Sequence, residues 1–374
     1  MRFQPLHLSH AADAADGGIA IAIGDLIAGQ RSLALNPLWV TADRFPSYRR
    51  DHDLAASVLA LSPELVHLHG IWRSPTRIAS RLTQAGLPLL VAPHGMLDPG
   101  ALAISRRKKQ LVWRLWERRS LQSASCLQAL CLAEARAIQA LLPSATIAVI
   151  PNGVQLPRIP APAESSSLPP PLWAGTIPPD APVLLFFGRF HSKKGLEPLL
   201  RAWQEVAAAV ERSGWWLALV GFGDHGALQR RVVAAQARGE LPQVFVGGPA
   251  FAAHKAAVLH GASSFVLPSF SEGLPMAALE AMAHQLPCLL SAACNIPEAF
   301  AAGAALTAEP DADALKASLL RLFSLSSGER NAMGAAGRAL VAEHFSWPQV
   351  AEQTLQLYQW ILGGGAPPAF VQMG

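Results

Sequence analysis

Two glutamates, Glu272 and Glu280, stand eight residues apart in the segment Pro268-Ser-Phe-Ser-Glu-Gly-Leu-Pro-Met-Ala-Ala-Leu-Glu-Ala-Met-Ala283. Residues 264–268 are predicted to form a short buried strand, and residues 274–285 a helix that begins between the two carboxylates. The first turn of a helix has free N–H groups at the positive end of the dipole, which suits an anion such as a diphosphate. A carboxylate on each side suits sugar hydroxyls, because ionised carboxylates are strong acceptors for O–H donors.

The predicted helix start consists of Gly273, Leu274, Pro275 and Met276. Glycine at position 273 lets a ligand approach the backbone closely, and proline at 275 suits a first turn, where a missing N–H costs nothing. A purely structural interpretation is also open. In that interpretation Glu272 interacts favourably with the helix dipole, and Glu280 pairs with His284 one turn later.

A cationic loop follows the strand predicted for Val183–Phe187. It carries Gly188, Arg189, Lys193, Lys194 and Gly195. Ligands of open α/β sheets bind beyond the carboxyl ends of the strands. Arginine offers phosphate a bidentate fork, and lysine offers a compact charge. Taken alone, the loop also fits a solvated turn, but together with the anion seat at 273–276 it predicts a pyrophosphate site.

Glycines and a histidine follow two strands predicted in the first half of the chain. Gly18, after Asp16 and Gly17, opens a helix, where glycine would let an acceptor or a donor phosphate approach. His94 follows the strand predicted for Leu89–Ala92, between a proline and a glycine. For His94, a role at a ligand site and a structural role are both open.

Two further histidines, His67 and His69, alternate in a predicted strand and therefore share one of its faces. Such a pair can bind a metal. No third ligand of suitable spacing follows, so buried structural histidines are the favoured interpretation and no metal site is predicted.

Strand and helix signals alternate along the chain, which indicates α/β architecture with parallel sheets. The predicted strands are 3–8, 36–41, 65–69, 89–92, 126–129, 146–150, 183–187, 215–220, 244–246, 264–267 and 288–291. A turn at Pro151–Val154 precedes a proline-rich segment, 155–182, which is typical of a linker or a surface excursion. The simplest arrangement is two doubly wound, Rossmann-like domains that face a central cleft.

Length and composition agree with two well-buried domains. The chain has 374 residues, 51% of them hydrophobic and 15% charged. No apolar run reaches the roughly 18 residues that a membrane span requires, and the N-terminus lacks the pattern of a signal peptide. The four cysteines have no metal-finger spacing. We therefore expect reduced cysteines and a cytoplasmic protein.

The net charge of +4 is unevenly distributed. Residues 105–122 carry seven basic side chains against one acidic side chain, Glu117. Interleaved leucine, valine and tryptophan make Arg106–Arg119 a basic amphipathic helix. It could lie on an anionic membrane surface, such as the inner face of the plasma membrane, or pack on the core with a solvated basic face. Nucleic acid is not an expected partner, because no recognition motif accompanies the patch.

In combination, these motifs resemble the retaining glycosyltransferases of family four, which have the GT-B fold. The likeness rests on Pro268-Ser269 with Glu272-x7-Glu280, Gly188-Arg189 with Lys194-Gly195, Ile150-Pro-Asn-Gly-Val154, His69-Gly-Ile-Trp72 and Pro93-His-Gly-Met-Leu-Asp-Pro99. The last two segments are similar to members that build bacterial surface polysaccharides. One departure is Ala262-Ser263, where the family commonly has Ala-Asp.

The resemblance implies a division of labour between domains. Residues 1–165 would bind the acceptor, residues 166–345 would bind a nucleotide-diphosphate sugar, and the helix in 346–374 would pack back on the first domain. Arg189 and Lys194, in the loop that Gly188 opens, would neutralise the diphosphate of the donor.

By matching position, the resemblance also implies roles for the other site residues. Glu280 would accept hydrogen bonds from the ribose hydroxyls, and Glu272 would contact the transferred sugar. The amides of Gly273–Met276 would lie near the sugar and phosphate, His94 would line the reacting centre, and Gly18 would lie near the donor phosphates. Members of the family need no metal and no separate cofactor, since cations of the protein stabilise the developing phosphate charge.

The expected activity is metal-independent transfer of a hexose-type sugar to a glycan or lipid-linked acceptor in surface polysaccharide synthesis. Two alternatives remain open. One keeps the fold and changes the reaction to that of a sugar-nucleotide epimerase or hydrolase. The other is a non-catalytic, membrane-associated assembly subunit that uses the basic helix.

Overall fold

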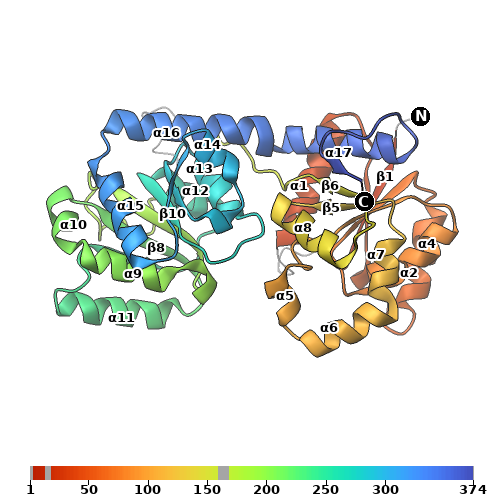
Figure 1. Cartoon of the computed structure of the whole chain (residues 1–374), viewed down its shortest axis with the longest axis horizontal. Coiled ribbons are helices and arrows are strands. Elements are labelled where there is room, and N and C mark those ends of the chain that lie inside the picture. The colour runs from red at the N-terminus through yellow and green to blue at the C-terminus, as the bar shows by residue number, and fades with distance from the viewer. Residues whose placement is uncertain (1–2, 13–17, 159–167, 374) are drawn as a thin grey trace. The chain divides into compact units, whose positions relative to one another are not determined.

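The structure is a computed structural model that describes residues 3–12, 18–158 and 168–373. It divides into two compact units (Figure 1). The first comprises residues 1–153 and 345–374, and the second comprises residues 154–344. The boundary between residues 153 and 154 therefore lies earlier in the chain than the predicted boundary between residues 165 and 166.

The first unit is built on a seven-stranded sheet whose strand order is β13-β6-β5-β4-β3-β1-β2. Its strands are β1 (Pro5–Ser9), β2 (Leu38–Thr41), β3 (Leu65–His69), β4 (Leu89–Ala92), β5 (Cys126–Ala129), β6 (Ile147–Val149) and β13 (Val371–Gln372). Neighbouring strands are parallel, except that β13 pairs antiparallel with β6. The sequence predicted β1 to β6, whereas the two-residue β13 carries no periodic signal.

Helices cover this sheet and bury its strands. They are α1 (Gly18–Ser32), η2 (Ala42–Arg44), α2 (Arg50–Ala60), α3 (Ser74–Arg77), α4 (Ala79–Gln84), α5 (Pro99–Ala103), α6 (Arg106–Val112), η3 (Trp113–Glu117), α7 (Arg118–Gln122), α8 (Leu132–Leu141) and α17 (Trp347–Ile361). The C-terminal helix α17 packs against α1.

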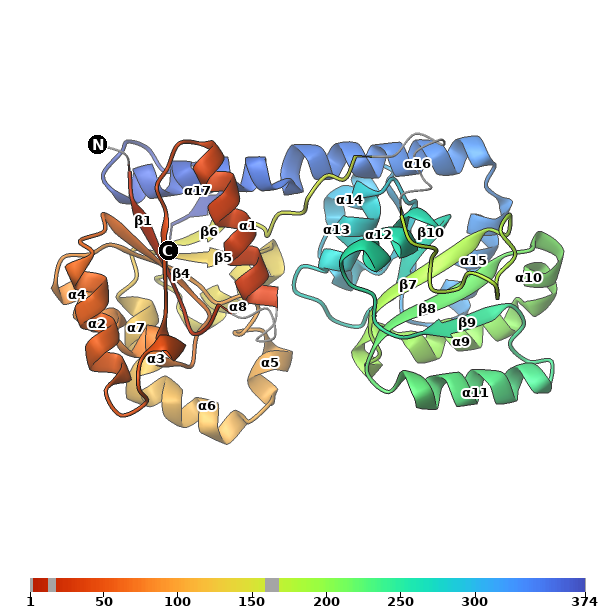
Figure 2. The same cartoon turned by 180° about the vertical axis from the view of Figure 1, so that it is seen from behind.

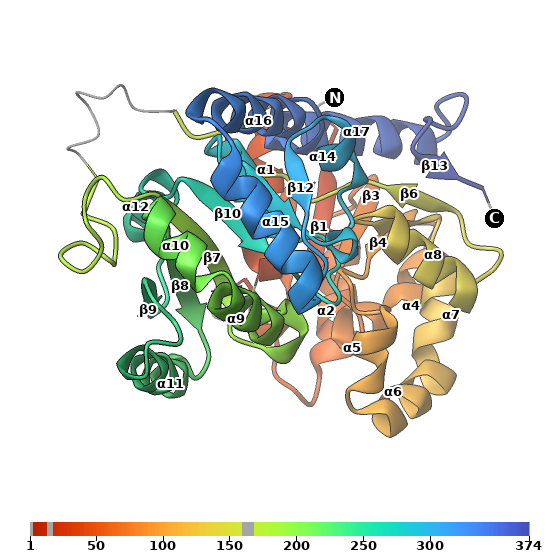
Figure 3. The same cartoon turned by 60° about the vertical axis from the view of Figure 1, so that its left-hand side comes forward.

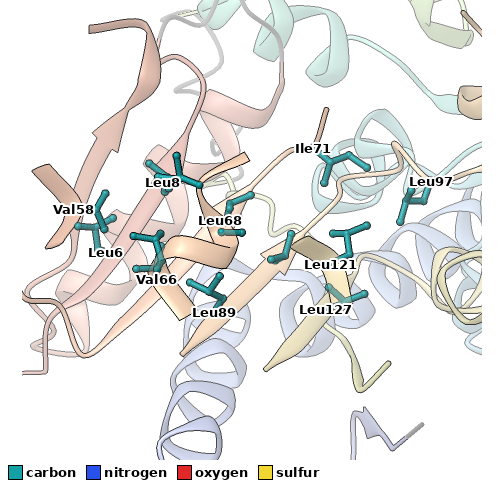
Figure 4. Close-up of a cluster of buried hydrophobic side chains, with 14 of the residues drawn as sticks. Leu6, Leu8, Val58, Val66, Leu68, Ile71, Leu89, Leu97, Leu121 and Leu127 are labelled. Atoms are coloured by element: carbon teal, nitrogen blue, oxygen red, sulfur yellow. The ribbon is translucent and has the colours of Figure 1, made fainter. Parts of the chain in front are cut away.

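Leucine and valine side chains from adjacent strands form the core of the first unit. Leu6 and Leu8 of β1 pack with Val66 and Leu68 of β3, and Leu89 of β4 continues the layer (Figure 4). All five are fully buried. Parallel strands buried on both faces read as nearly continuous hydrophobic runs, which is why the sequence predicted β4 with its observed bounds. The bounds of β3 were also predicted as observed, although His67 and His69 interrupt its apolar run.

The second unit has a parallel six-stranded sheet with the order β12-β11-β10-β7-β8-β9. Its strands are β7 (Val183–Arg189), β8 (Trp216–Phe222), β9 (Val244–Gly247), β10 (Ser264–Leu267), β11 (Cys288–Leu290) and β12 (Ala305–Thr307). Figure 2 shows β7, β8 and β9 side by side. The three-residue β12 was not predicted.

Helices also connect the strands of the second unit. They are η5 (Ser192–Lys194), α9 (Leu196–Glu205), α10 (Ala207–Ser213), α11 (His225–Ala237), α12 (Ala252–His260), α13 (Met276–Ala283), η6 (Ala292–Cys294), α14 (Pro297–Ala301), α15 (Ala312–Ser324) and α16 (Ser327–Leu340), followed by η7 (Val341–Phe345). Helices α9 and α15 pack side by side (Figure 3). Among the described helices, none combines the length and the hydrophobicity that crossing a bilayer requires.

Part of the proline-rich segment belongs to the second unit. Trp173 and Ile177 are buried, and the Trp173 ring meets Phe245 edge-on with centroids 6.5 Å apart. Earlier in the segment, Arg338 of α16 donates a hydrogen bond to the carbonyl oxygen of Pro157 at 2.8 Å. These contacts attach Pro157 and Trp173, on either side of the undescribed residues 159–167, to the second unit. The described part of the proline-rich segment is therefore not a free linker.

Helix α16 packs closely on the end of α13. Arg338 donates a hydrogen bond to the carbonyl oxygen of Ala283 at 2.5 Å. A Cβ atom at Gly334 would lie 1.9 Å from the carbonyl oxygen of Gln285, which is far inside contact distance. The pair therefore depends on glycine at this position.

We predict that Gly334→Ala destabilises the second unit by about 1–3 kcal/mol, because the added methyl group forces α16 away from α13. Gly328→Ala in the same helix is the matched control, since a Cβ atom there meets only the Ser326 hydroxyl at 3.9 Å. Urea unfolding monitored by circular dichroism measures both. Equal stability of the two variants would contradict the packing argument.

Candidate functional site

The two loops of the predicted pyrophosphate site, residues 188–195 and 268–275, follow neighbouring parallel strands, β7 and β10. Gly195 lies in the left-handed region with φ of 70°, and a Cβ atom there would be 1.8 Å from the carbonyl oxygen of Pro268. Only glycine allows this approach. The N–H of Phe270 donates to the carbonyl oxygen of Lys193 at 2.8 Å and fastens the two loops together.

This approach brings Lys194 to Glu272. The Lys194 Nζ lies 2.6 Å from Glu272 Oε1, and the two side chains are only 16% and 7% exposed. The Ser269 hydroxyl donates to the same carboxylate oxygen at 2.5 Å. The side-chain amide of Asn295 donates to the carbonyl oxygens of Glu272 and Gly273 at 2.7 and 3.1 Å. Both the carboxylate and its backbone are therefore held in place.

The second carboxylate has a lysine of its own. Lys255 of α12 places its Nζ 2.8 Å from Oε1 of Glu280. The expected alternative, a pairing of the Glu280 side chain with His284, is wrong. His284 instead uses its Nδ1 on the backbone carbonyl oxygen of Glu280 at 2.8 Å, and burial lowers the pKa of its ring.

The helix between the two carboxylates starts later than predicted. Helix α13 begins at Met276, and Pro275 is its N-cap residue, with φ of −79° and ψ of 95°, rather than part of the first turn. The helix starts later than predicted because the backbone at Pro275 is extended. In the described part of the chain, the amides of Met276 and Ala277 have no hydrogen-bond acceptor. The free donors of the predicted anion seat therefore lie at these two residues, and Gly273 and Leu274 belong to the loop before them.

Arg189, at the end of β7 after Gly188, is not brought into the same contact. Its guanidinium is exposed and lies 5.2 Å from the centroid of the Phe222 ring. No carboxylate of the described residues pairs with it. The structure thus joins Lys194 to Glu272, and it leaves Arg189 as an exposed cation at the carboxyl end of the sheet.

In the first unit, His94 follows β4 in a strained conformation. Its φ of 53° lies in the left-handed region, which is uncommon for a residue with a side chain and is concentrated at functional sites. Buried Glu134 secures the loop by accepting hydrogen bonds from the N–H groups of Gly95 and Leu130 at 2.6 and 2.8 Å. Burial raises the pKa of Glu134 to about 7. No sequence pattern predicted a role for this carboxylate.

His94 is the end of a series of hydrogen-bonded side chains, which we call the histidine chain. Its members are His94, His69, His7, Gln30, Tyr358 and His67. The series runs from His94 Nε2 to His69 Nδ1 (3.1 Å), and from His69 Nε2 to His7 Nδ1 (2.9 Å). It continues from His7 Nε2 to Gln30 Oε1 (2.8 Å), from Gln30 Nε2 to the Tyr358 hydroxyl (3.2 Å) and from that hydroxyl to His67 Nδ1 (2.7 Å).

His7 was not among the predicted site residues. It lies on β1 directly opposite His67 of β3, so three histidines share one face of the sheet. Their ligand atoms lie within 4.8 Å of one another. The third histidine that a metal site would require is therefore present. The signal that could have found it is the position of His7 within the strand predicted for residues 3–8, although the pairing of that strand with β3 is a feature of the tertiary structure.

Two further predictions for the first unit concern Gly18 and the basic helix. Gly18 is exposed and opens α1, while Asp16 and Gly17 lie outside the described residues. The basic helix is interrupted: α6 and α7 flank a π-helical turn, η3, in which Glu117 is buried. Burial raises the pKa of Glu117 to about 7.

Apolar side chains of the basic helix face outward. Leu111 and Leu115 are 60% and 64% exposed, beside exposed arginines and lysines. Next to them lies a pocket of about 480 Å³. Its lining consists of Trp72, Pro99, Leu102, Ala103, Arg106, Lys109, Gln110, Trp113, Arg114 and Leu141. The helix packs on the core through Trp113 and Leu121, and it also leaves these two leucines exposed to water.

Both halves of the chain match known families. Residues 181–324 match the family described as "Glycosyl transferases group 1", and residues 17–153 match "Glycosyl transferase 4-like domain". The chain belongs to the glycosyltransferases of family four. Every predicted donor-site residue, from Gly188 to Glu280, lies within the first match, and His94 and Gly18 lie within the second.

Individual relatives agree with this membership. The glycosyltransferase is 38% identical over 107 residues to the MMP alpha-(1→4)-mannosyltransferase of Mycolicibacterium hassiacum, which covers 28% of this chain and 26% of that protein. It is 35% identical over 99 residues to the O-antigen chain mannosyltransferase B of Escherichia coli, covering 26% and 25%. The matches span half or less of the curated relatives' length.

The whole glycosyltransferase has the GT-B fold. Anabaena HepE, solved in complex with UDP and glucose, superposes with a TM-score of 0.67 at 17% sequence identity. The superposition covers 95% of this chain and 99% of HepE. At this level of identity the likeness establishes the fold.

The histidine chain makes the stability of the first unit depend on pH. Burial lowers the pKa of His7 and His94 to about 4, and it lowers those of His67 and His69 well below 6.5. Below pH 6.5 the unfolded chain takes up protons at these four positions and the folded unit does not, so stability falls on acidification. The raised pKa values of Glu117 and Glu134 act in the opposite direction between pH 7 and 4.5.

We predict that four histidines outweigh two carboxyl groups, and that the first unit loses stability between pH 6.5 and about 4. Hydrogen exchange of β1 and β3 measures this, as protection factors corrected for the intrinsic exchange rate. Strands β7 and β8 of the second unit serve as the internal reference. Protection of β1 and β3 that stays constant or rises on acidification would show that the carboxyl groups dominate.

Proposed function

We propose that this glycosyltransferase is a retaining, metal-independent enzyme that moves a hexose-type sugar from a nucleotide-diphosphate sugar to a glycan or lipid-linked acceptor. The observation that carries the proposal is the pair of lysine–glutamate contacts on either side of the free amides at the start of α13. Lys194 contacts Glu272, and Lys255 contacts Glu280. This arrangement combines cations for a diphosphate with carboxylates for hydroxyls.

The diphosphate of the donor would bind at the start of α13. The amides of Met276 and Ala277 would donate to phosphate oxygens at the positive end of the helix dipole. Lys194, which contacts Glu272 in the loop before α13, would contribute its ammonium, and exposed Arg189 would add a bidentate contact. Negative charge grows on the diphosphate as the sugar departs, so these cations would stabilise the transition state more than the bound donor.

The two carboxylates would bind and orient hydroxyl groups. Glu280 lies on the same helix face as Met276. It would accept hydrogen bonds from the ribose, while Lys255 donates to its Oε1. Glu272 would contact the transferred sugar. The Ser269 hydroxyl and Lys194 both already donate to its Oε1, which leaves Oε2 for the sugar. Neither carboxylate is proposed as an acid or base.

The proposed acceptor is attached to a lipid. The pocket beside α6 is mainly apolar, which suits a lipid chain, and Arg106 and Arg114 in its lining suit an anionic phosphate head group. Exposed Leu111 and Leu115 would enter the bilayer beside it. We therefore propose that the enzyme works at the inner face of the plasma membrane as a cytoplasmic, peripheral protein.

The relatives support the same chemistry. HepE was solved with UDP and glucose, and the Escherichia coli relative is named as an O-antigen chain mannosyltransferase. These names favour a nucleotide-sugar donor and a role in surface polysaccharide synthesis over an epimerase, a hydrolase or a non-catalytic subunit.

We predict that Lys194→Ala lowers the rate of transfer about 10²- to 10³-fold, because it removes one cation that stabilises the leaving diphosphate. Glu280→Gln should weaken donor binding, since an amide is a weaker acceptor than a carboxylate. Both effects are measured with a donor found by a thermal-shift screen of nucleotide sugars, because a bound ligand stabilises the folded state.

Arg238→Ala is the control, because Arg238 forms an exposed ion pair with Glu240, away from these loops. Full activity of Lys194→Ala and Glu280→Gln would overturn the site assignment. Stoichiometric turnover of the donor without any acceptor would instead favour the hydrolase or epimerase.

We predict that neutralising Arg106, Arg107 and Lys108 to Gln lowers binding to anionic vesicles about 100-fold at low salt, since each cation near the surface contributes about 1 kcal/mol. Lys109 is left in place because its Nζ donates to the carbonyl oxygen of Ala101 at 2.5 Å. Co-sedimentation with vesicles measures binding.

Leu111→Gln with Leu115→Gln tests the apolar contribution to the same binding. Leu320→Gln, at an exposed leucine of the second unit, is the matched control. Vesicle binding unchanged by the charge-neutralising and leucine variants would rule out membrane attachment through this helix.

A further inference from the structure

One amide sets the direction of the hydrogen bonds in the histidine chain. Gln30 donates through Nε2 to the Tyr358 hydroxyl at 3.2 Å, and its Oε1 lies 2.8 Å from His7 Nε2. An amide oxygen can only accept, so His7 Nε2 is the donor of the second contact and carries the proton of that ring.

The Tyr358 hydroxyl accepts from Gln30 and therefore gives its own proton to His67 Nδ1, at 2.7 Å. Neutral His67 then has its lone pair at Nδ1 and its proton at Nε2. That Nε2 is buried and makes no hydrogen bond with the described residues. Gln128 Oε1 is likewise buried without a partner among them, while Gln128 Nε2 donates to the carbonyl oxygen of Ile150 at 3.0 Å.

The rings of His7 and His69 carry the same direction of donation on to His94. His7 has its proton on Nε2, so its Nδ1 accepts from His69 Nε2 at 2.9 Å. His69 then has its lone pair at Nδ1, which accepts from His94 Nε2 at 3.1 Å. Burial lowers the pKa of all four rings, which keeps each with a single proton. Nδ1 of His94 makes no hydrogen bond with the described residues.

We infer that the histidine chain fixes His94 as the tautomer protonated at Nε2, so that its Nδ1 presents a lone pair to the ligand. Gln30 and Tyr358 are then positioning residues, although neither is next to His94. For its effect on catalysis the inference rests on the proposed function. His94 would accept a hydrogen bond from a sugar hydroxyl, and it would disfavour a phosphate oxygen, which has no proton to donate.

A metal ion at His7, His67 and His69 is the competing use of the same side chains. Metal ligation requires ring lone pairs, and the chain already uses the lone pairs of these rings as acceptors. The two arrangements are therefore mutually exclusive. Nitrogen contacts of 2.7 to 2.9 Å at His7 and His67 are hydrogen-bond distances.

The test is long-range proton–nitrogen NMR of the full chain labelled with ¹⁵N-histidine. An unconstrained imidazole exchanges between both tautomers, whereas the chain predicts one tautomer, protonated at Nε2, for His7, His67, His69 and His94. Tyr358→Phe removes the hydroxyl that joins Gln30 to His67, and Gln30→Met removes both amide contacts. In both variants His94 should lose its single-tautomer signal. Thr354→Ser, at a buried position of the same helix, keeps its hydroxyl and should leave the signal unchanged.

Activity gives a second and separate measurement. If the proposed transfer is observed, kcat/KM of Tyr358→Phe and Gln30→Met should fall about 10- to 100-fold, as for other residues that orient a histidine from behind. The expected NMR pattern without any transfer would sustain the histidine chain and overturn the proposed function.

Three results would overturn the inference. One is a wild-type His94 protonated at Nδ1 or averaged between tautomers. Another is a His94 signal that Tyr358→Phe and Gln30→Met leave unchanged in folded protein. The third is a stoichiometric metal ion in the purified protein that is lost in a His7→Gln variant.

Discussion

The donor site depends on one close backbone contact. Gly195 approaches the carbonyl oxygen of Pro268 so closely that no side chain fits between them. This contact draws the loop after β7 onto the loop after β10 and sets Lys194 on Glu272. The free amides of α13, the ion pair and the second pair at Glu280 are then held in one region. Conformational freedom at a single glycine thus determines whether separate motifs become a site.

The first unit relies on a different device. Its sheet buries polar rings among leucines, and buried polar groups are stable only when their hydrogen bonds are made. The histidine chain meets most of this requirement through contacts between β1, β3, α1 and α17, and His67 Nε2 is the buried ring nitrogen that it leaves without a partner among the described residues. The same contacts connect a C-terminal tyrosine to the strained His94 loop. Order in the core and the chemistry offered to a ligand are therefore linked in this unit.

Local sequence signals predicted most strands but not all details of the site. Parallel strands such as β4 and β10 are short, nearly continuous apolar runs, so their bounds could be predicted as observed. The short strands β12 and β13 exist through pairing with a neighbour and leave no such run. The predicted start of α13 was two residues early, because the extended backbone of Pro275 is set by the loop contacts around it. The contact of Lys255 with Glu280 joins residues 25 apart in the sequence, and no local pattern predicts it.

The sequence by itself determined the α/β class, the glycine- and lysine-rich loops at strand ends and the pair of glutamates around a helix start. These are short-range features, and spacing along the chain is enough to define them. Only the tertiary structure decided which residues meet. His7 joined His67 and His69 because β1 lies beside β3, and the alternative partner of Glu280 was replaced by Lys255 because α12 packs near α13. Contacts between residues far apart in sequence depend on strand order and packing, which no local pattern encodes.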